Sequence, residues 1–208
     1  MTGIDLFLSK SLSLKIKDNL EPKIQQKLKL NLFKKYGYSI KQSILDFSAF
    51  DGELNEFLKS DSLKFEKDCL FKIINFEEIK KNSLVLLIKD ESLIKQILEI
   101  VGDKESRKIL EQVAKKPLAV PDILKICKLS KTSGYRKINN LSRNGYLIRT
   151  GFELTSKKRA VDKYTIFWEK IMMEIKEGTY FVKIKISMSV FYNSTIIQKI
   201  FKNGLANS

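Results

Sequence analysis

The polar side chains between Lys131 and Arg143 carry the most distinctive chemistry of this 208-residue chain. Gly134, Ile138 and Leu141 recur there at intervals of four and three residues, which predicts a helix that turns these three towards a core. The opposite face then offers hydrogen-bond donors, acceptors and planar groups but no carboxylate. Such a face suits phosphates and the edges of bases in a DNA major groove. The candidate DNA-binding residues of this helix are Lys131, Thr132, Ser133, Tyr135, Arg136, Lys137, Asn139, Asn140 and Arg143.

Positive charge is concentrated around this segment. Residues 1–99 hold 17 Lys/Arg and 15 Asp/Glu, whereas residues 100–208 hold 22 and 9, so the second half carries +13 of the net +15. Residues 125–163 alone hold 11 basic side chains against two acids, Glu153 and Asp162. A polyanionic partner explains such self-repulsion. A solvated, solubilising surface is the alternative, and it explains a cluster confined to one helix and one hairpin tip less well.

Two helices and a hairpin would position these residues. The pattern predicts a first helix over Val120–Lys128, with Pro121 suited to its first turn and an apolar face for the core. A break at Leu129-Ser130 follows, where Ser130 can cap the second helix, Lys131–Leu141. After Asn144-Gly145, strand-like runs over Tyr146–Glu153 and Val161–Phe167 flank a basic loop over residues 155–159. Lys157, Lys158, Arg159 and Lys163 complete the candidate DNA-binding set.

The run Leu129–Leu141, continued by Asn144–Ile148, resembles the recognition helix and following strand of archaeal winged helix-turn-helix regulators of the ArsR-like group. That family's pattern is a small polar cap, a Ser/Thr pair, an apolar position, an Arg, an apolar pair and a Gly before the wing strand. Gly134 departs from it at the apolar position. The resemblance spans Asp103 to Ile175 and implies a recognition helix over about 131–143 and a wing over about 154–160. The cysteine motif of the metal-sensing founding members is absent, so metal sensing is not implied.

Residues 4 to about 75 read as consecutive helical segments. Pro22–Tyr36 places Ile24, Leu28, Leu32 and Phe33 on one face and stops at Gly37; Ser39 can cap a short helix through Leu45. A third helix opens at Ser48 or Asp51, and a fourth covers Ser60–Asn75. With its turn over residues 33–40, this region resembles the Nitrosopumilus-type output domain found ahead of winged helices in archaeal regulators. A generic helical dimerisation module is the competing interpretation.

The rest of the chain divides into shorter elements. Leu84–Ile88 reads as a strand, and Glu91–Val101 and Lys104–Lys115 read as helices, the second capped by Asp103. Beyond the wing we predict a helix over Phe167–Lys176, a strand over Val182–Val190 and a helix over Ser194–Phe201. The expected fold is therefore mainly α with a small β wing. Its expected divisions are a helical output or sensor-like domain (1–80), a connecting strand and helix (81–102), the winged helix-turn-helix domain (103–177) and a strand-helix extension (178–208).

Several classes of protein are disfavoured by the residues the chain lacks. There is no histidine, and no Walker loop, GxGxxG, GxSxG or CxxC motif, so we expect no enzyme, no metal and no cofactor. No run of 18 apolar residues exists and the N-terminus lacks signal-peptide features, which favours a cytoplasmic protein without membrane contact. Cys69 and Cys127 fall on apolar helix faces and are expected to be buried free thiols. Trp168 is expected to anchor packing or a dimer interface.

These observations predict a sequence-specific, double-stranded DNA-binding transcriptional regulator. The alternatives are a winged helix that docks proteins of the transcription apparatus and an RNA-binding factor. Basic residues at the wing tip favour DNA, since a protein-docking winged helix would not need them. Apolar residues after the wing predict a homodimer, unless this tail folds back on its own chain. A protein partner or a signal would act through the N-terminal region.

Overall fold

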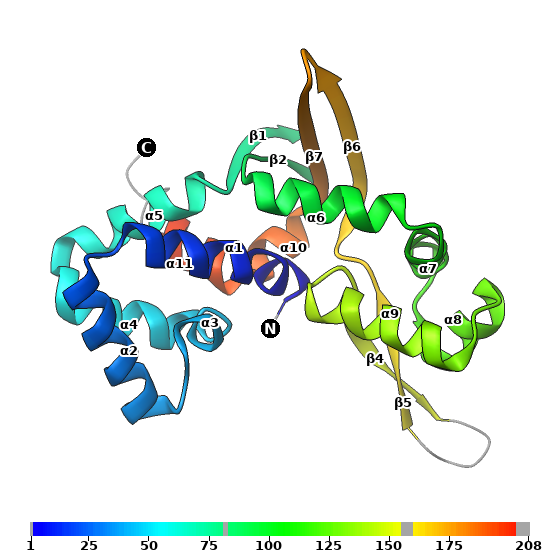
Figure 1. The fold of residues 1–208 in the computed structure, drawn as a ribbon, viewed down its shortest axis with the longest axis horizontal. Helices are drawn as coiled ribbons and strands as arrows, with labels where there is room; N and C mark the ends of the chain where they lie inside the picture. Colours follow the sequence, from blue (N-terminus) through cyan, green and yellow to red (C-terminus); the bar gives the residue numbers. More distant parts are fainter. Residues whose placement is uncertain (1, 81–82, 155–159, 203–208) are drawn as a thin grey trace.

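The computed structural model describes residues 2–80, 83–154 and 160–202 (Figure 1). It is mostly helical and contains two antiparallel sheets, as expected for the coarse fold class. Five α-helices and a 3₁₀ turn make up residues 3–71 of this described part. They are α1 (Gly3–Asn19), α2 (Pro22–Tyr36), α3 (Ile40–Ser43), α4 (Phe47–Leu58), η1 (Lys59–Asp61) and α5 (Ser62–Phe71).

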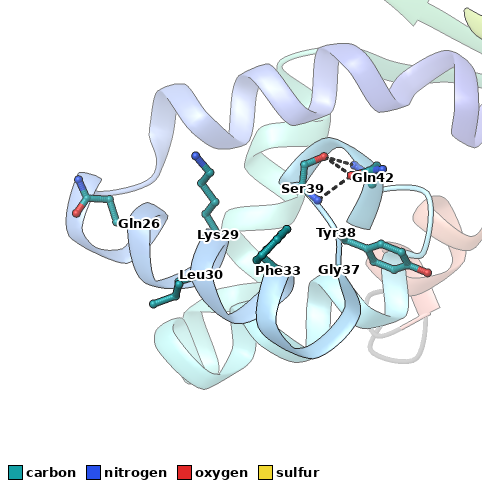
Figure 2. Close-up of a pocket in the computed structure, with 8 residues that line it drawn as sticks. All are labelled: Gln26, Lys29, Leu30, Phe33, Gly37, Tyr38, Ser39 and Gln42. Carbon is teal, nitrogen blue, oxygen red and sulfur yellow. Dashed lines mark hydrogen bonds between the residues drawn. The ribbon is translucent and has the colours of Figure 1, made fainter.

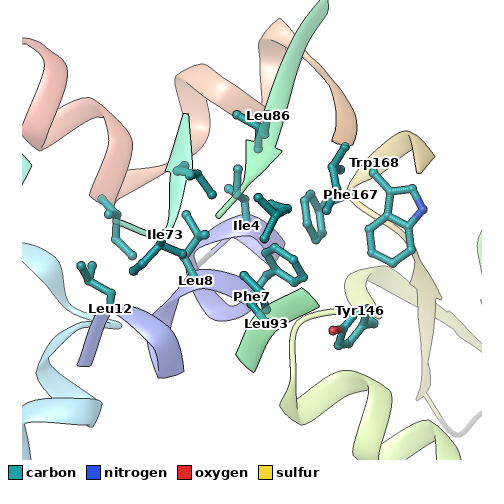
Figure 3. Packing of buried hydrophobic residues seen from close by; sticks show 14 of the residues in the cluster. Ile4, Phe7, Leu8, Leu12, Ile73, Leu86, Leu93, Tyr146, Phe167 and Trp168 are labelled. Carbon is teal, nitrogen blue, oxygen red and sulfur yellow. The ribbon is translucent and has the colours of Figure 1, made fainter. Parts of the chain in front are cut away.

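Helix α1 is the centre of the molecule. Apolar side chains such as Ile4, Leu8 and Leu12 are buried, and so are its serines at positions 9, 11 and 13. A helix buried on most sides shows no single apolar stripe, because neighbours contact it all round. Figure 3 shows Ile4, Phe7 and Leu8 of α1 between Leu86 and Tyr146, so one continuous core joins segments far apart in the sequence.

Two buried carboxylates connect α1 to helices far away in the sequence through hydrogen bonds. Asp5 accepts hydrogen bonds from the Ser194 hydroxyl (2.5 Å) and the Thr195 amide (3.0 Å), and thereby caps a helix near the C-terminus. Asp90 accepts from the Ser11 hydroxyl at 2.9 Å and lies 3.1 Å from the Lys15 ammonium. Buried carboxylates require such hydrogen bonds, and Asp90 has a cationic partner as well.

The larger sheet is built from segments far apart in the sequence. Its strands are β1 (Ile74–Lys80), β2 (Ser83–Ile88), β6 (Trp168–Lys176) and β7 (Thr179–Ser187), in the spatial order β1-β2-β7-β6. All neighbours are antiparallel. It therefore takes strands from all four of the predicted divisions of the chain. Val182, Ile184 and Ile186 of β7 are buried in the core beneath it.

The helix predicted over Phe167–Lys176 is wrong, because this segment is strand β6. It pairs with β7 from Trp168↔Ile186 to Lys176↔Thr179. Glu177 and Gly178 both have positive φ (50° and 76°) and form a two-residue hairpin loop, a backbone that the right-handed twist of paired strands favours. The fourth N-terminal helix was also predicted too long, since α5 ends at Phe71 and β1 begins at Ile74.

The middle of the chain follows the predicted order of elements closely. Helices α6 (Glu91–Gly102) and α7 (Lys104–Lys115) meet at Asp103, whose carboxylate accepts from the Ser106 amide as the predicted cap. After them come β3 (Leu118–Ala119), α8 (Val120–Cys127), α9 (Lys131–Arg143), β4 (Ile148–Leu154) and β5 (Ala160–Thr165). The last three strands form the second sheet, in the order β3-β5-β4.

The apolar series at the C-terminus is buried within its own chain. After α10 (Met188–Asn193), helix α11 (Thr195–Lys202) buries Ile196, Ile197 and Ile200 completely. It packs against α4 and α5, and Lys199 lies 3.1 Å from Asp51. The tail therefore folds back on the N-terminal helices, which was the alternative to burial in a dimer.

Other predictions concern single side chains. Leu28 and Leu32 of α2 are buried, but Phe33 was wrongly assigned to the same inner face and is 67% exposed. Cys69 and Cys127 are free and buried, as expected. Trp168 is buried and packs edge-to-face on Tyr146 and Phe167, which confirms its packing role. None of the helices described is long and apolar enough to cross a membrane.

Candidate nucleic-acid interface

The turn between α8 and α9 fixes the orientation of the candidate recognition helix. Lys128 ends α8 in a left-handed conformation (φ 54°), and the Leu129 amide donates to the Leu124 carbonyl at 3.0 Å. Ser130 caps α9 as predicted, because its hydroxyl oxygen accepts from the Ser133 amide at 3.2 Å. The local sequence therefore specifies where α9 begins.

The inner face of α9 packs as its spacing predicts. Gly134, Ile138 and Leu141 are buried. A methyl group on Gly134 would come within 1.9 Å of the Leu124 side chain, so the glycine allows α8 to approach closely. Behind them, α7 contributes buried Ile109 and Val113 to the same core. These contacts hold the outer face of α9 in a fixed position.

Most of the predicted outer face is exposed. Tyr135, for example, has 47% of its surface accessible. Lys131, Arg136 and Arg143 form no ion pair with any other residue that the structure describes. These cations can therefore meet an external anion without breaking an internal contact. The exposed row, called the α9 row below, consists of Lys131, Thr132, Tyr135, Arg136, Asn139, Asn140 and Arg143.

Two members of the predicted set turn towards α7 instead. The Lys137 ammonium lies 2.6 Å from an Asp103 carboxylate oxygen and 3.4 Å from one of Glu105, and its side chain is only 19% exposed. The Ser133 hydroxyl donates to Glu105 at 3.3 Å. Hydrogen bonds from Lys137 and Ser106 lower the pKa of Asp103 to about 2. Lys137 and Ser133 therefore connect α9 to α7.

A polar hollow of about 570 Å³ runs beside the α9 row. Arg136, Asn139 and Arg143 line one part of it. Glu99, near the end of α6, and Asp103, between α6 and α7, line another part. The cations of α9 are thus bounded by carboxylates on one side. A polyanion would favour the opposite side of the row, towards solvent.

The hairpin β4–β5 belongs to the second sheet and follows α9 in the chain (Figure 1). Lys163 lies 3.2 Å from Glu153, and Arg149 lies 3.1 Å from Asp162, so both cations are paired across the strands. Lys157, Lys158 and Arg159, predicted at the tip, lie outside the described residues. Lys163 is therefore less available to an external anion than its sequence position suggested.

Sequence reasoning missed two apolar side chains on this hairpin. Phe152 and Leu154 of β4 are 67% and 66% exposed. Alternating residues of a strand point to one face, so the two lie together on one side of the hairpin. The strict alternation of Phe152, Glu153 and Leu154 was the available signal, since it is typical of a strand with one apolar face.

A second hollow lies far from α9, among the N-terminal helices. It has a volume of about 380 Å³ and a mainly apolar lining. Figure 2 shows Leu30 and Phe33 on α2, Tyr38 and Ser39 on the turn that follows, and Gln42, the capping partner of Ser39, on α3. The turn over residues 33–40 therefore builds this hollow, and exposure of Phe33 is explained by its place in the wall.

Comparison with known proteins gave no match to any family model, curated protein or solved structure. The resemblance to ArsR-like regulators and to a Nitrosopumilus-type output domain therefore stays a prediction. Among the described residues, no group of His, Cys, Asp and Glu side chains is arranged to hold a metal ion.

Proposed function

We propose that this chain is a sequence-specific, double-stranded DNA-binding transcriptional regulator. In this proposal α7, α8 and α9 with the sheet β3-β5-β4 form a winged helix-turn-helix, α9 enters the major groove and the hairpin β4–β5 is the wing. The observation that carries the proposal is the α9 row, an exposed strip of cationic and amide side chains on a helix whose inner face is fixed by packing.

The chemistry of the α9 row divides by role. Arg136 can make paired hydrogen bonds to guanine, and Asn139 can do so to adenine, whereas the Asn140 amide oxygen already accepts from the Asn144 amide at 2.9 Å. Lys131 and Arg143 lie at opposite ends of the helix and suit phosphates on either side of the groove. This division supports binding of a duplex with a sequence preference, with no catalytic step and no cofactor.

Selection from a random pool tests this proposal directly. The full chain would be incubated with random-sequence DNA duplexes, and the bound duplexes would be sequenced over several rounds. We expect an enriched motif, and weaker binding to the same sequence as duplex RNA, whose deep major groove excludes a helix. A pool that stays random, or equal binding of both duplexes, would contradict sequence-specific DNA recognition.

The exposed pair Phe152 and Leu154 favours a second candidate function, docking of a protein on the hairpin. Apolar side chains exposed in this way are typical of the centre of a protein interface. The double substitution Phe152→Ser with Leu154→Ser distinguishes the two functions. DNA binding that persists in this variant assigns the pair to another partner, whereas loss of DNA binding with the fold intact assigns it to the DNA interface.

A further inference from the structure

Strand β6 has one free edge. It pairs with β7 on one side, and no described strand pairs with its other side. Edge strands usually avoid self-association through prolines, bulges, a short length or charged side chains. The charged residues of β6 are of both signs, so they can pair with those of a second copy: Glu169, Lys170, Glu174 and Lys176. β6 has no proline, and its only irregularity of register lies between Trp168 and Lys170, so the stretch from Lys170 to Lys176 is regular.

The hairpin of β6 and β7 carries apolar surface that the described part of the chain leaves uncovered. Ile171, Met173 and Ile175 lie opposite Ile184, Val182 and Tyr180, on the sheet face that is buried nearer the core. Towards the tip this face emerges, with Met173 39% and Ile175 64% exposed. Because α11 is buried against α4 and α5, this hairpin is the part of the C-terminal region that still presents an apolar face.

The hairpin loop determines which backbone groups point outwards. In a two-residue hairpin the residues that flank the loop, here Lys176 and Thr179, form a hydrogen-bonded pair, and such pairs alternate along the strands. The N–H and C=O groups of Ile171, Met173 and Ile175 therefore face away from β7. A partner strand would pair with these odd-numbered positions.

We propose that a second copy of this chain pairs antiparallel with the free edge of β6, with the two-fold axis at Met172, so that one sheet continues through both copies. In this register Ile171 lies opposite the second copy's Met173. The outward-facing N–H and C=O groups of these two residues can then form hydrogen bonds with each other. Lys170 lies opposite Glu174 of the other copy, twice by symmetry. Lys170 forms no ion pair with another described residue of its own chain, whereas Glu174 lies 3.1 Å from Lys176.

Neighbouring registers are less favourable. A two-fold axis at Met173 would place Lys170 opposite Lys176 and Glu169 opposite Glu177, two repulsive combinations. An axis at Ile171 would pair Lys170 with Met172 and leave Glu174 opposite Trp168. The charges along β6 therefore select the axis at Met172. The β6–β7 and β4–β5 hairpins project from opposite sides of the molecule (Figure 1), so the proposed interface is remote from the β4–β5 hairpin.

Cysteine cross-linking of the full-length protein tests the register. At the proposed axis, residue 172 faces its own copy at about 4.5 Å between Cα atoms, within reach of a disulfide. Mild oxidation of Met172→Cys should give a covalent dimer. Met173→Cys is the matched control, because its two copies lie diagonally, about 7 Å or more apart, and should not cross-link. The native cysteines are buried and should stay reduced.

Charge reversal tests the same interface without cysteine. Light scattering should give twice the 24.1 kDa chain mass for the wild type at micromolar concentration. Lys170→Glu or Glu174→Lys should each raise the dimer dissociation constant about tenfold, and the double reversal should restore it. Glu177→Lys, in the loop, changes the charge equally and should have no effect. A concentration-independent monomer, equal cross-linking at 172 and 173, or a double variant as weak as the single ones would overturn the proposal.

Discussion

Gly145 lies directly against the backbone of Phe7. A methyl group on Gly145 would approach the Phe7 amide nitrogen to 2.4 Å, and Gly145 has a φ of 75° that side chains disfavour. The neighbouring Phe7 and Tyr146 rings meet edge-to-face, with 5.5 Å between their centres (Figure 3). The turn after α9 is thus held by the first helix of the chain.

Substitution of Gly145 should therefore destabilise the whole fold. Gly145→Ala combines an unfavourable φ with a backbone clash, and we expect the free energy of unfolding to fall by at least about 2 kcal/mol in urea denaturation. Gly52→Ala is the control, because no atom would lie within 4 Å of the added carbon. It should change stability by no more than about 1 kcal/mol, in the stabilising direction. Equal stability of both variants would show that Phe7 and Gly145 are not in fixed contact.

Arg136 is the residue of the α9 row whose loss should most affect sequence preference. Arg136→Ala should weaken binding to a selected duplex by about 1–3 kcal/mol and relax preference at one position, as for a lost bidentate contact to guanine. Gel-shift titration against single-base variants of the site measures both effects. Lys64→Ala removes one exposed charge from α5 and should leave affinity nearly unchanged. Unaltered affinity and preference in Arg136→Ala would remove Arg136 from the interface.

The predicted wing tip should act differently. Replacing Lys157, Lys158 and Arg159 together by Ala should weaken binding to every duplex alike. If they contact phosphates, the dependence of affinity on salt should become shallower by up to about 0.9 per lost contact. Affinities measured over a series of salt concentrations would show this change, and an unchanged slope would exclude the tip from DNA contact.

Lys137 should contribute to stability more than to sequence preference. A double-mutant cycle of Lys137→Ala with Asp103→Ala should give a coupling of about 0.2–1 kcal/mol in the free energy of unfolding, as for an ion pair that solvent still reaches. Because the pKa of Asp103 is lowered, this contribution should be present above pH 3.8 and be lost as the pH falls through about 2. Lys131→Ala should show no coupling with Asp103→Ala. A coupling for Lys131 as large as for Lys137 would contradict the assignment.

Glu66 should make stability fall as the pH rises. Burial raises the pKa of this carboxyl from 4.5 to about 8, Asp51 adds to the shift and Lys199 opposes it. Between these two pH values the folded chain keeps Glu66 protonated while the unfolded chain ionises it. The contribution of Glu66 to the free energy of unfolding is therefore fully present below pH 4.5 and is lost as the pH approaches 8. Glu66→Gln should abolish about 1–3 kcal/mol of this decline.

The control for this measurement is Glu177→Gln, which changes an exposed carboxyl in the hairpin loop. Its free energy of unfolding should follow the wild-type curve between about pH 5 and about pH 8. If Glu66→Gln also follows the wild-type curve, Glu66 is ionised in the folded protein.

Local signals predicted α8, α9 and their turn well, because Ser130, Pro121 and the apolar spacing act within a few residues. Strand β6 was missed because Ile171, Met172 and Ile175 also fit a helical face. Its pairing with β7 decides the conformation of this segment. A two-residue loop ending in glycine between apolar runs was the signal available for a hairpin.

The position of α9 and its exposed polar face were predicted, but the pairing of its side chains with other helices was not. Spacing placed Ser133 and Lys137 on the outer face, yet the acids that bind them, Asp103 and Glu105, lie about 30 residues earlier in the sequence. Such pairing depends on how α7 crosses α9. The contact of Phe7 with Gly145 is more remote still, and no periodicity within either segment encodes it.

The hydrogen bonds from α11 to Asp5 join residues 189 to 191 positions apart. During synthesis α1 leaves the ribosome long before Ser194 is made, so the Asp5 carboxylate lacks these hydrogen-bond donors until the end of the chain is reached. Strand β2 likewise lacks β7, its partner about 100 residues later, until that part of the chain is made. The core can therefore close only after α11 has emerged, and nascent chains shorter than this should remain open to proteases.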